Sequence, residues 1–277
     1  MNLIYQCFIQ TGKNDGHNGG KYSDGRLVLK SKETVSEYAK SIGCDYIFED
    51  KPDLPESKVY KDVFMKFLWC LALCEEKFDE YEWIMYIDSD IVMKSPDDIP
   101  NIFNEIDKSK DFHAVNEPNG YAKYYNNIFI KTRYSMDFIK DHAYIYDFYH
   151  KIHEYMNTGV WIANRKCRKL FRENWVNMLN NRKSIDQTNA WPHKNFGTED
   201  MPLINGMVHN LGISYSFLDC KWNAIADVLK PEFLKKEAYC IHYGGVYSKI
   251  IFDNPEELLG RGNLANLYYK NFAHLKK

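Results

Sequence analysis

Two aspartates, Asp88 and Asp90, interrupt an apolar stretch at Tyr81–Met93, which reads YEWIMYIDSDIVM. The residues just before them, Trp83–Ile87, are aromatic and β-branched and predict a short buried strand. A carboxylate without a partner is very costly to bury, so both aspartates should lie where the strand emerges. Residues two apart in an extended chain point to the same side, so the two carboxylates can converge on one ligand.

The chemistry that this pair favours is a divalent metal that holds a phosphate. Mg²⁺ and Mn²⁺ prefer carboxylate oxygens and keep positions open for substrate oxygens. The alternative interpretation of D-S-D is a strand-end turn with a helix cap, since Asp and Ser are common in turns. A cap needs no apolar strand leading into it, so we favour the metal site.

The elements around this stretch predict an α/β fold with mostly parallel strands. We expect strands at 3–9 and 45–48 with a helix at 27–41 between them, and a long helix at 58–77 before the strand at 83–87. Strand–helix–strand units of this spacing favour parallel strands. Ligands of open α/β sheets bind beyond the carboxyl ends of the strands, so the two aspartates occupy a position that suits a nucleotide.

Three further stretches place polar residues beside an apolar strand or a helix start. They are Met156–Asn164 (MNTGVWIAN), Thr198–Asn205 (TEDMPLIN) and Tyr239–Gly245 (YCIHYGG). A helix is expected at 168–180, after the first of them. The acidic pair Glu199 and Asp200 also suits a helix N-terminus, where carboxylates interact favourably with the helix dipole.

Composition is that of a globular protein of 277 residues, with 45% hydrophobic and 27% charged residues. The net charge of −2 gives no electrostatic case for nucleic-acid binding. The seven cysteines form no C-x-x-C motif, which favours a reducing compartment, and Cys70 and Cys74, one helical turn apart in an apolar stretch, are expected to be core thiols. No segment is long and apolar enough for a transmembrane helix. We therefore expect a cytoplasmic protein whose membrane contact, if any, is peripheral.

The order of the motifs is E-W-I-M-Y-I-D-S-D, N-T-G-V-W-I-A-N, E-D-M-P-L-I-N and H-Y-G-G. In this order they resemble GT-A fold glycosyltransferases, most closely family 34, the galactosyl-, xylosyl- and mannosyltransferase group, with family 8 as a neighbour. The similarity covers residues 58–95 and 155–245. It implies one GT-A domain over residues 1–277, with a Rossmann-like, mostly parallel sheet flanked by helices and a small acceptor-side subdomain. Residues 1–115 would form the nucleotide-binding half, and 116–277 the acceptor and catalytic half.

The resemblance implies transfer of a sugar from a nucleotide-sugar donor to a glycan or glycoconjugate acceptor, with retention of anomeric configuration. A UDP-sugar is the favoured donor and GDP-mannose the alternative. The cofactor would be Mn²⁺, or else Mg²⁺, bound by Asp88, Asp90 and His242. A metal of this kind neutralises charge that develops on a leaving diphosphate.

A set of donor-binding residues follows from the same resemblance: Lys66, Asp88, Ser89, Asn157, Gly245 and Lys249. Lys66 equally suits a solvated helix position, and Asn157 a cap or turn. Lys249 lies four residues after Gly245, whereas the family 8 lysine lies three residues after its glycine.

The catalytic candidates are Glu199 and Asp200, which stand where the two families carry D-Q. Asp200 therefore occupies the glutamine position. A carboxylate there can act as a nucleophile, stabilise an oxocarbenium ion or serve as a general base. The first two roles suit retention and the third suits inversion.

Two other functions compete with this one. D-S-D-I-V fits the motif of haloacid-dehalogenase phosphatases, with Asp88 as nucleophile, but in those enzymes the motif usually comes early in the chain. The second alternative is a catalytically inactive nucleotide- or sugar-binding module. The presence of both D-x-D and His242 argues against it.

Overall fold

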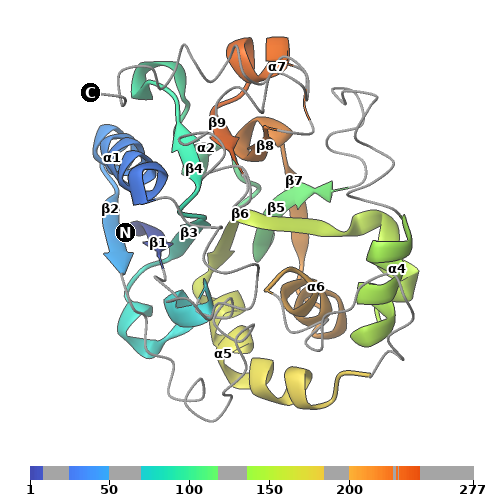
Figure 1. Cartoon of the computed structure of the whole chain (residues 1–277). Helices are drawn as coiled ribbons and strands as arrows, with labels where there is room; N and C mark the ends of the chain where they lie inside the picture. Colours follow the sequence, from blue (N-terminus) through green and yellow to red (C-terminus); the bar gives the residue numbers. More distant parts are fainter. Residues whose placement is uncertain are drawn as a thin grey trace.

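The computed structural model describes residues 1–8, 25–49, 70–117, 136–183, 200–226, 229 and 231–243. A six-stranded sheet lies at its centre, in the order β2-β1-β3-β6-β5-β7 (Figure 1). In chain order these strands are β1 (Asn2–Cys7), β2 (Asp45–Glu49), β3 (Trp83–Ile87), β5 (Phe112–Asn116), β6 (Met156–Asn164) and β7 (Tyr215–Leu218).

The central sheet is mixed and mostly parallel, as predicted. Strand β1 is parallel to both β2 and β3, and β5 is parallel to β7. Strand β6 runs antiparallel to both its neighbours, β3 and β5. The carboxyl end of β3 therefore meets the first half of β6, the part that carries the N-T-G motif.

A second, three-stranded sheet has the order β4-β9-β8. Its strands are β4 (Ile91–Met93), β8 (Ala224–Ile225) and β9 (Cys240–His242). Strand β4 follows the D-S-D turn directly and pairs antiparallel with β9. The strand expected within 239–245 is β9, but its pairing with β4 and β8 was not predicted, because strands of two or three residues carry almost no periodicity.

Helices cover both faces of the central sheet. They are α1 (Gly25–Ser41), α2 (Ile102–Glu105), α4 (Met136–Ile145), α5 (Arg165–Asn180), α6 (Asp200–Asn210) and α7 (Pro231–Lys236). Side chains alternate along each strand, so one core forms with α1, α7 and the small sheet, and the other with α4, α5 and α6. None of the helices in the described part of the chain combines the length and apolar character that crossing a membrane requires.

Two predicted helices differ from those observed. Of the helix expected at 58–77, the described residues form 3-10 turns, at Cys70–Cys74 and Glu76–Phe78, and residues 58–69 lie outside the described part of the chain. The helix expected at 168–180 begins at Arg165, because the side chain of Asn164 caps it by accepting the backbone N–H of Cys167. All seven cysteines are free, and six of them are buried, among them Cys70 and Cys74, the two predicted core thiols.

Arg168, in the first turn of α5, fixes the start of β3. Its buried guanidinium donates to the backbone carbonyls of Tyr81 at 2.6 Å, Ala163 at 3.0 Å and Phe78 at 3.1 Å. These carbonyls lie before β3 and at the end of β6. The side chain therefore ties together the two central strands that carry site residues.

Arg168→Met should lower the free energy of unfolding by about 3 kcal/mol or more, because several buried carbonyls lose their donors. Chemical denaturation measures this value. The matched control is Lys169→Met on the exposed side of the same helix turn, which should stay within about 0.5 kcal/mol of wild type. Equal effects of the two substitutions would contradict the anchoring role of Arg168.

Candidate metal and donor site

The D-S-D motif forms a tight turn between the two sheets. Strand β3 ends at Ile87, and the N–H of Ile91 donates to the carbonyl of Asp88 at 3.2 Å, which closes a β-turn. The chain then enters β4, where Ile91 lies opposite His242 of β9. The turn thus directs both aspartates toward a histidine that is far away in sequence.

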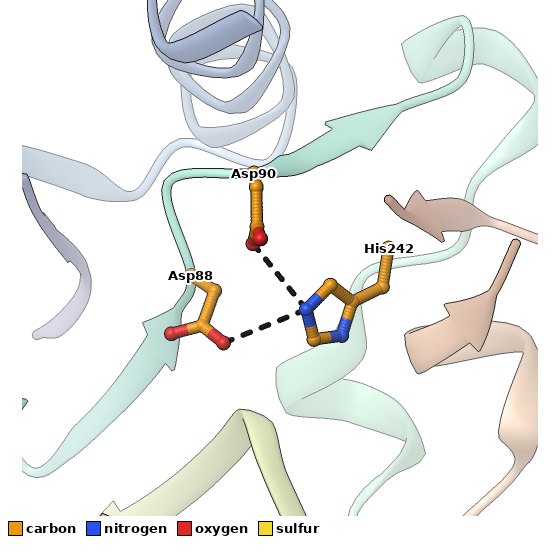
Figure 2. A group of neighbouring side chains, drawn as sticks. All are labelled: Asp88, Asp90 and His242. Carbon is orange, nitrogen blue, oxygen red and sulfur yellow. Dashed lines mark ion pairs between the residues drawn. The ribbon is translucent and has the colours of Figure 1, made fainter. Parts of the chain in front are cut away.

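Asp88, Asp90 and His242 form one cluster, as predicted. Figure 2 shows both carboxylates pointing at the same ring nitrogen. His242 Nε2 lies 3.3 Å from Asp90 Oδ1 and 3.7 Å from Asp88 Oδ2. One ligand atom from each residue lies within 4.8 Å of the others. Two carboxylates and an imidazole suit a divalent metal that accepts both oxygen and nitrogen.

The electrostatics of the cluster disfavour the charged form of Asp88. Burial and the charge of Asp90 raise the pKa of Asp88 well above its usual range, although the imidazole of His242 acts in the opposite direction. The side chains still expose 30% for Asp88, 22% for Asp90 and 14% for His242. A cation can therefore reach the cluster and hold both carboxylates in the ionised form.

Three hydrogen bonds fix the position of Asp88. The Tyr86 hydroxyl donates to Asp88 Oδ1 at 2.8 Å, the Asp88 N–H donates to the Gly159 carbonyl at 2.9 Å, and Gln6 Nε2 donates to the Asp88 carbonyl at 3.1 Å. With Oδ1 engaged by Tyr86, Oδ2 is the carboxylate oxygen that faces His242.

A bulge in β6 shapes the N-T-G motif. The register with β5 steps from Ala114–Trp161 to Val115–Asn157, so residues 158–160 lie on β6 with no counterpart on β5. Bulges of this kind re-aim side chains beside functional sites. Here the bulge brings the backbone of Gly159 against the ring of His242.

Gly159 leaves the room that this ring needs. A Cβ at position 159 would lie 2.6 Å from Cε1 and 2.7 Å from Nδ1 of His242, and 3.2 Å from Asn157 Oδ1. The first two distances are far below van der Waals contact. The glycine of N-T-G is therefore required for close approach of the histidine.

Asn157 and Asn223 connect the bulge to His242. Asn157 Oδ1 accepts the backbone N–H of Gly159 at 2.9 Å and also the side-chain amide of Asn223. Asn223 Oδ1 in turn lies 2.8 Å from Nδ1 of His242. Both asparagines are buried.

Asp200, the first residue of α6, lies beside the same bulge. Its Oδ2 accepts the Thr158 hydroxyl at 2.5 Å. Burial raises the pKa of Asp200, and the Thr158 bond opposes that rise. Asn205 holds α6 in place, because its side-chain amide both accepts from the N–H of Met156 at 2.8 Å and donates to the Met156 carbonyl at 2.9 Å.

The structure thus places the predicted site residues that it describes after β3, at the start of β6, at the end of β9 and at the start of α6. Ser89 occupies the D-S-D turn and is half-buried. Four predicted residues lie outside the described part of the chain and stay predictions: Lys66, Glu199, Gly245 and Lys249. Sequence reasoning assigned no role to Gln6, Tyr86 and Asn223, and it assigned none to Thr158 and Gly159 although both stand in the N-T-G motif.

No protein-family profile and no curated protein matches the sequence. Solved structures do match. One is a glycosyltransferase involved in the glycosylation of the major capsid of PBCV-1, with 17% identity and a TM-score of 0.50 over 97% of this chain and 98% of that one. Another is the apo structure of the bifunctional glycosyltransferase WbbM, with 14% identity and a TM-score of 0.50 over 96% of this chain and 51% of that one.

The chain has the GT-A fold. At these identities the likeness shows the fold alone, and the assignment to family 34 stays a prediction. In this fold, the D-S-D turn leaves the carboxyl end of a parallel strand, where α/β sheets bind their ligands.

Gly159→Ala should lower the free energy of unfolding by about 1–3 kcal/mol, because the new methyl group overlaps the His242 ring. In a His242→Ala background the overlap is absent, so the same substitution should cost much less. A double-mutant cycle from denaturation curves measures the difference. An equal cost in both backgrounds would show that the ring does not need this glycine.

Proposed function

We propose that this protein is a metal-dependent glycosyltransferase that moves a sugar from a nucleotide-sugar donor to a glycan acceptor. The observation that carries the proposal is the cluster of Asp88, Asp90 and His242, which is open to solvent at the carboxyl end of β3 in a GT-A fold. Both solved structures named above are glycosyltransferases by their titles, which supports the same function. A UDP-sugar is the favoured donor, and GDP-mannose is the alternative.

Asp88 Oδ2, Asp90 Oδ1 and His242 Nε2 would hold the metal. Mn²⁺ suits this mixed set of oxygen and nitrogen ligands, and Mg²⁺ is the alternative. When bound, the metal supplies positive charge for the diphosphate that leaves the sugar. Tyr86 contributes by engaging the second oxygen of Asp88, which leaves one oxygen for the metal.

Asp200 is the proposed catalytic residue, with Glu199 beside it in sequence. Thr158 holds one carboxylate oxygen of Asp200, and Asn205 fixes the helix that carries it. A carboxylate held in this way can stabilise positive charge on the sugar or attack its anomeric carbon, and both roles give retention. A general-base role would give inversion instead, so the anomeric configuration of the product distinguishes them.

The remaining donor contacts are proposals from the family resemblance. Ser89 lies in the D-S-D turn, and Asn157 is linked to His242 through Asn223, which supports proposing both as donor contacts. Lys66, Gly245 and Lys249 are proposed to contact the donor on the resemblance alone.

Asp90→Asn should abolish metal-dependent binding of UDP, because a metal ligand is weakened and the cluster loses a charge. Asp200→Asn should leave that binding intact and slow donor turnover by about 10²–10⁴-fold. Calorimetry with and without Mn²⁺ measures binding, and hydrolysis of a panel of UDP- and GDP-sugars measures turnover. Asp97→Asn, at an exposed acid in the next turn, is the matched control and should change neither.

Three results would contradict the proposal. If neither UDP nor GDP binds in a metal-dependent way, there is no donor site of the proposed kind. Hydrolysis of p-nitrophenyl phosphate that disappears in Asp88→Asn would indicate a phosphatase. Metal-dependent nucleotide binding without turnover of any nucleotide sugar would indicate an inactive binding module.

A further inference from the structure

The two ring nitrogens of His242 have different surroundings. Nε2 faces the carboxylates of Asp88 and Asp90, and Nδ1 lies 2.8 Å from Asn223 Oδ1. A neutral imidazole carries its proton on one nitrogen and a lone pair on the other. Only a lone pair on Nε2 would serve a metal between the carboxylates, so the position of the proton matters.

The position of this proton can be traced from the backbone of β6. The N–H of Gly159 can only donate, and it donates to one end of the Asn157 amide at 2.9 Å, so that end is the oxygen. Asn223 contacts the same oxygen with its side chain, so it presents its NH₂ group there. The other end of the Asn223 amide, the oxygen, therefore faces His242.

An amide oxygen accepts hydrogen bonds and cannot donate them. Nδ1 of His242 must then carry the proton that Asn223 accepts. The lone pair of the neutral ring is left on Nε2, on the side of the two aspartates. Reversing the Asn223 amide would set its oxygen against Asn157 Oδ1 in a buried environment, which costs the hydrogen bond and leaves two acceptors in contact.

We propose that Asn223, oriented by Asn157, is a positioning residue that holds His242 in the Nδ1–H tautomer so that Nε2 can bind the metal. This inference rests on the metal site of the proposed function and gives Asn157 a role behind the ligand. Residues of this kind hold the second nitrogen of a metal-binding histidine, and their mutation typically weakens metal binding by about 10–100-fold.

Four variants test the proposal through Mn²⁺ affinity without nucleotide, measured by electron paramagnetic resonance. Asn223→Ala removes the acceptor at Nδ1, and Asn157→Leu removes the oxygen that orients Asn223. Each should weaken Mn²⁺ binding by about 10–100-fold. Asn157→Asp keeps that oxygen and should bind Mn²⁺ more tightly than Asn157→Leu. Asn104→Ala, at an exposed asparagine of α2, should match wild type.

A second measurement reads the tautomer directly in the metal-free protein. Long-range ¹H–¹⁵N spectra at alkaline pH, where the ring is neutral, report which nitrogen carries the proton, and His242→Gln assigns the signals. We expect the proton on Nδ1 in wild type and loss of this preference in Asn223→Ala. A purely structural role of Asn223 would leave the tautomer unchanged.

Two results would overturn the inference. The first is a spectrum in which wild-type His242 carries its proton on Nε2. The second is Mn²⁺ binding by both Asn223→Ala and Asn157→Leu that is as tight as in the wild type. Failure of the proposed function would give a different result, because the wild-type protein itself would then not bind Mn²⁺. The tautomer spectrum of the metal-free protein would still test the role of Asn223. If Asn223→Ala does not fold, the Asn157 pair and the wild-type spectrum give the answer.

Discussion

Repulsion between two carboxylates at the end of a buried strand is the constraint on which the site depends. Asp88 and Asp90 point to the same place, and the pKa of Asp88 rises because burial and its neighbour both disfavour the charged form. Such a pair either takes up a proton or binds a cation. The tight turn and the pairing of β4 with β9 place the ring of His242 beside both carboxylates, and the cluster stays accessible to a cation.

Gly159 links Asp88 on one side of the cluster to His242 on the other. Its carbonyl accepts the N–H of Asp88, and its own N–H sets the orientation of Asn157. Its missing side chain makes room for the ring of His242. One bulged residue of β6 therefore positions a carboxylate directly and a histidine through two amides. The GT-A fold brings these pieces together from segments that are remote in sequence.

The sequence predicts the parts of the site that depend on local pattern. Carboxylates directly after the apolar run Trp83–Ile87 can be recognised because buried charge is so unfavourable, and His242 at the end of a short strand was found through the family resemblance. Asn223 could not be found in this way, since its role depends on contacts with Asn157, 66 positions away, and with His242. The capped start of α5 at Arg165 was also missed, because apolar periodicity does not report a cap.

The most direct test of the metal site is anomalous diffraction from crystals grown with Mn²⁺ and UDP. We expect a manganese peak bonded to carboxylate oxygens of Asp88 and Asp90 and to Nε2 of His242, with the diphosphate on its open side. A peak elsewhere, coordination through Nδ1 of His242, or bound UDP without metal at this cluster would contradict it.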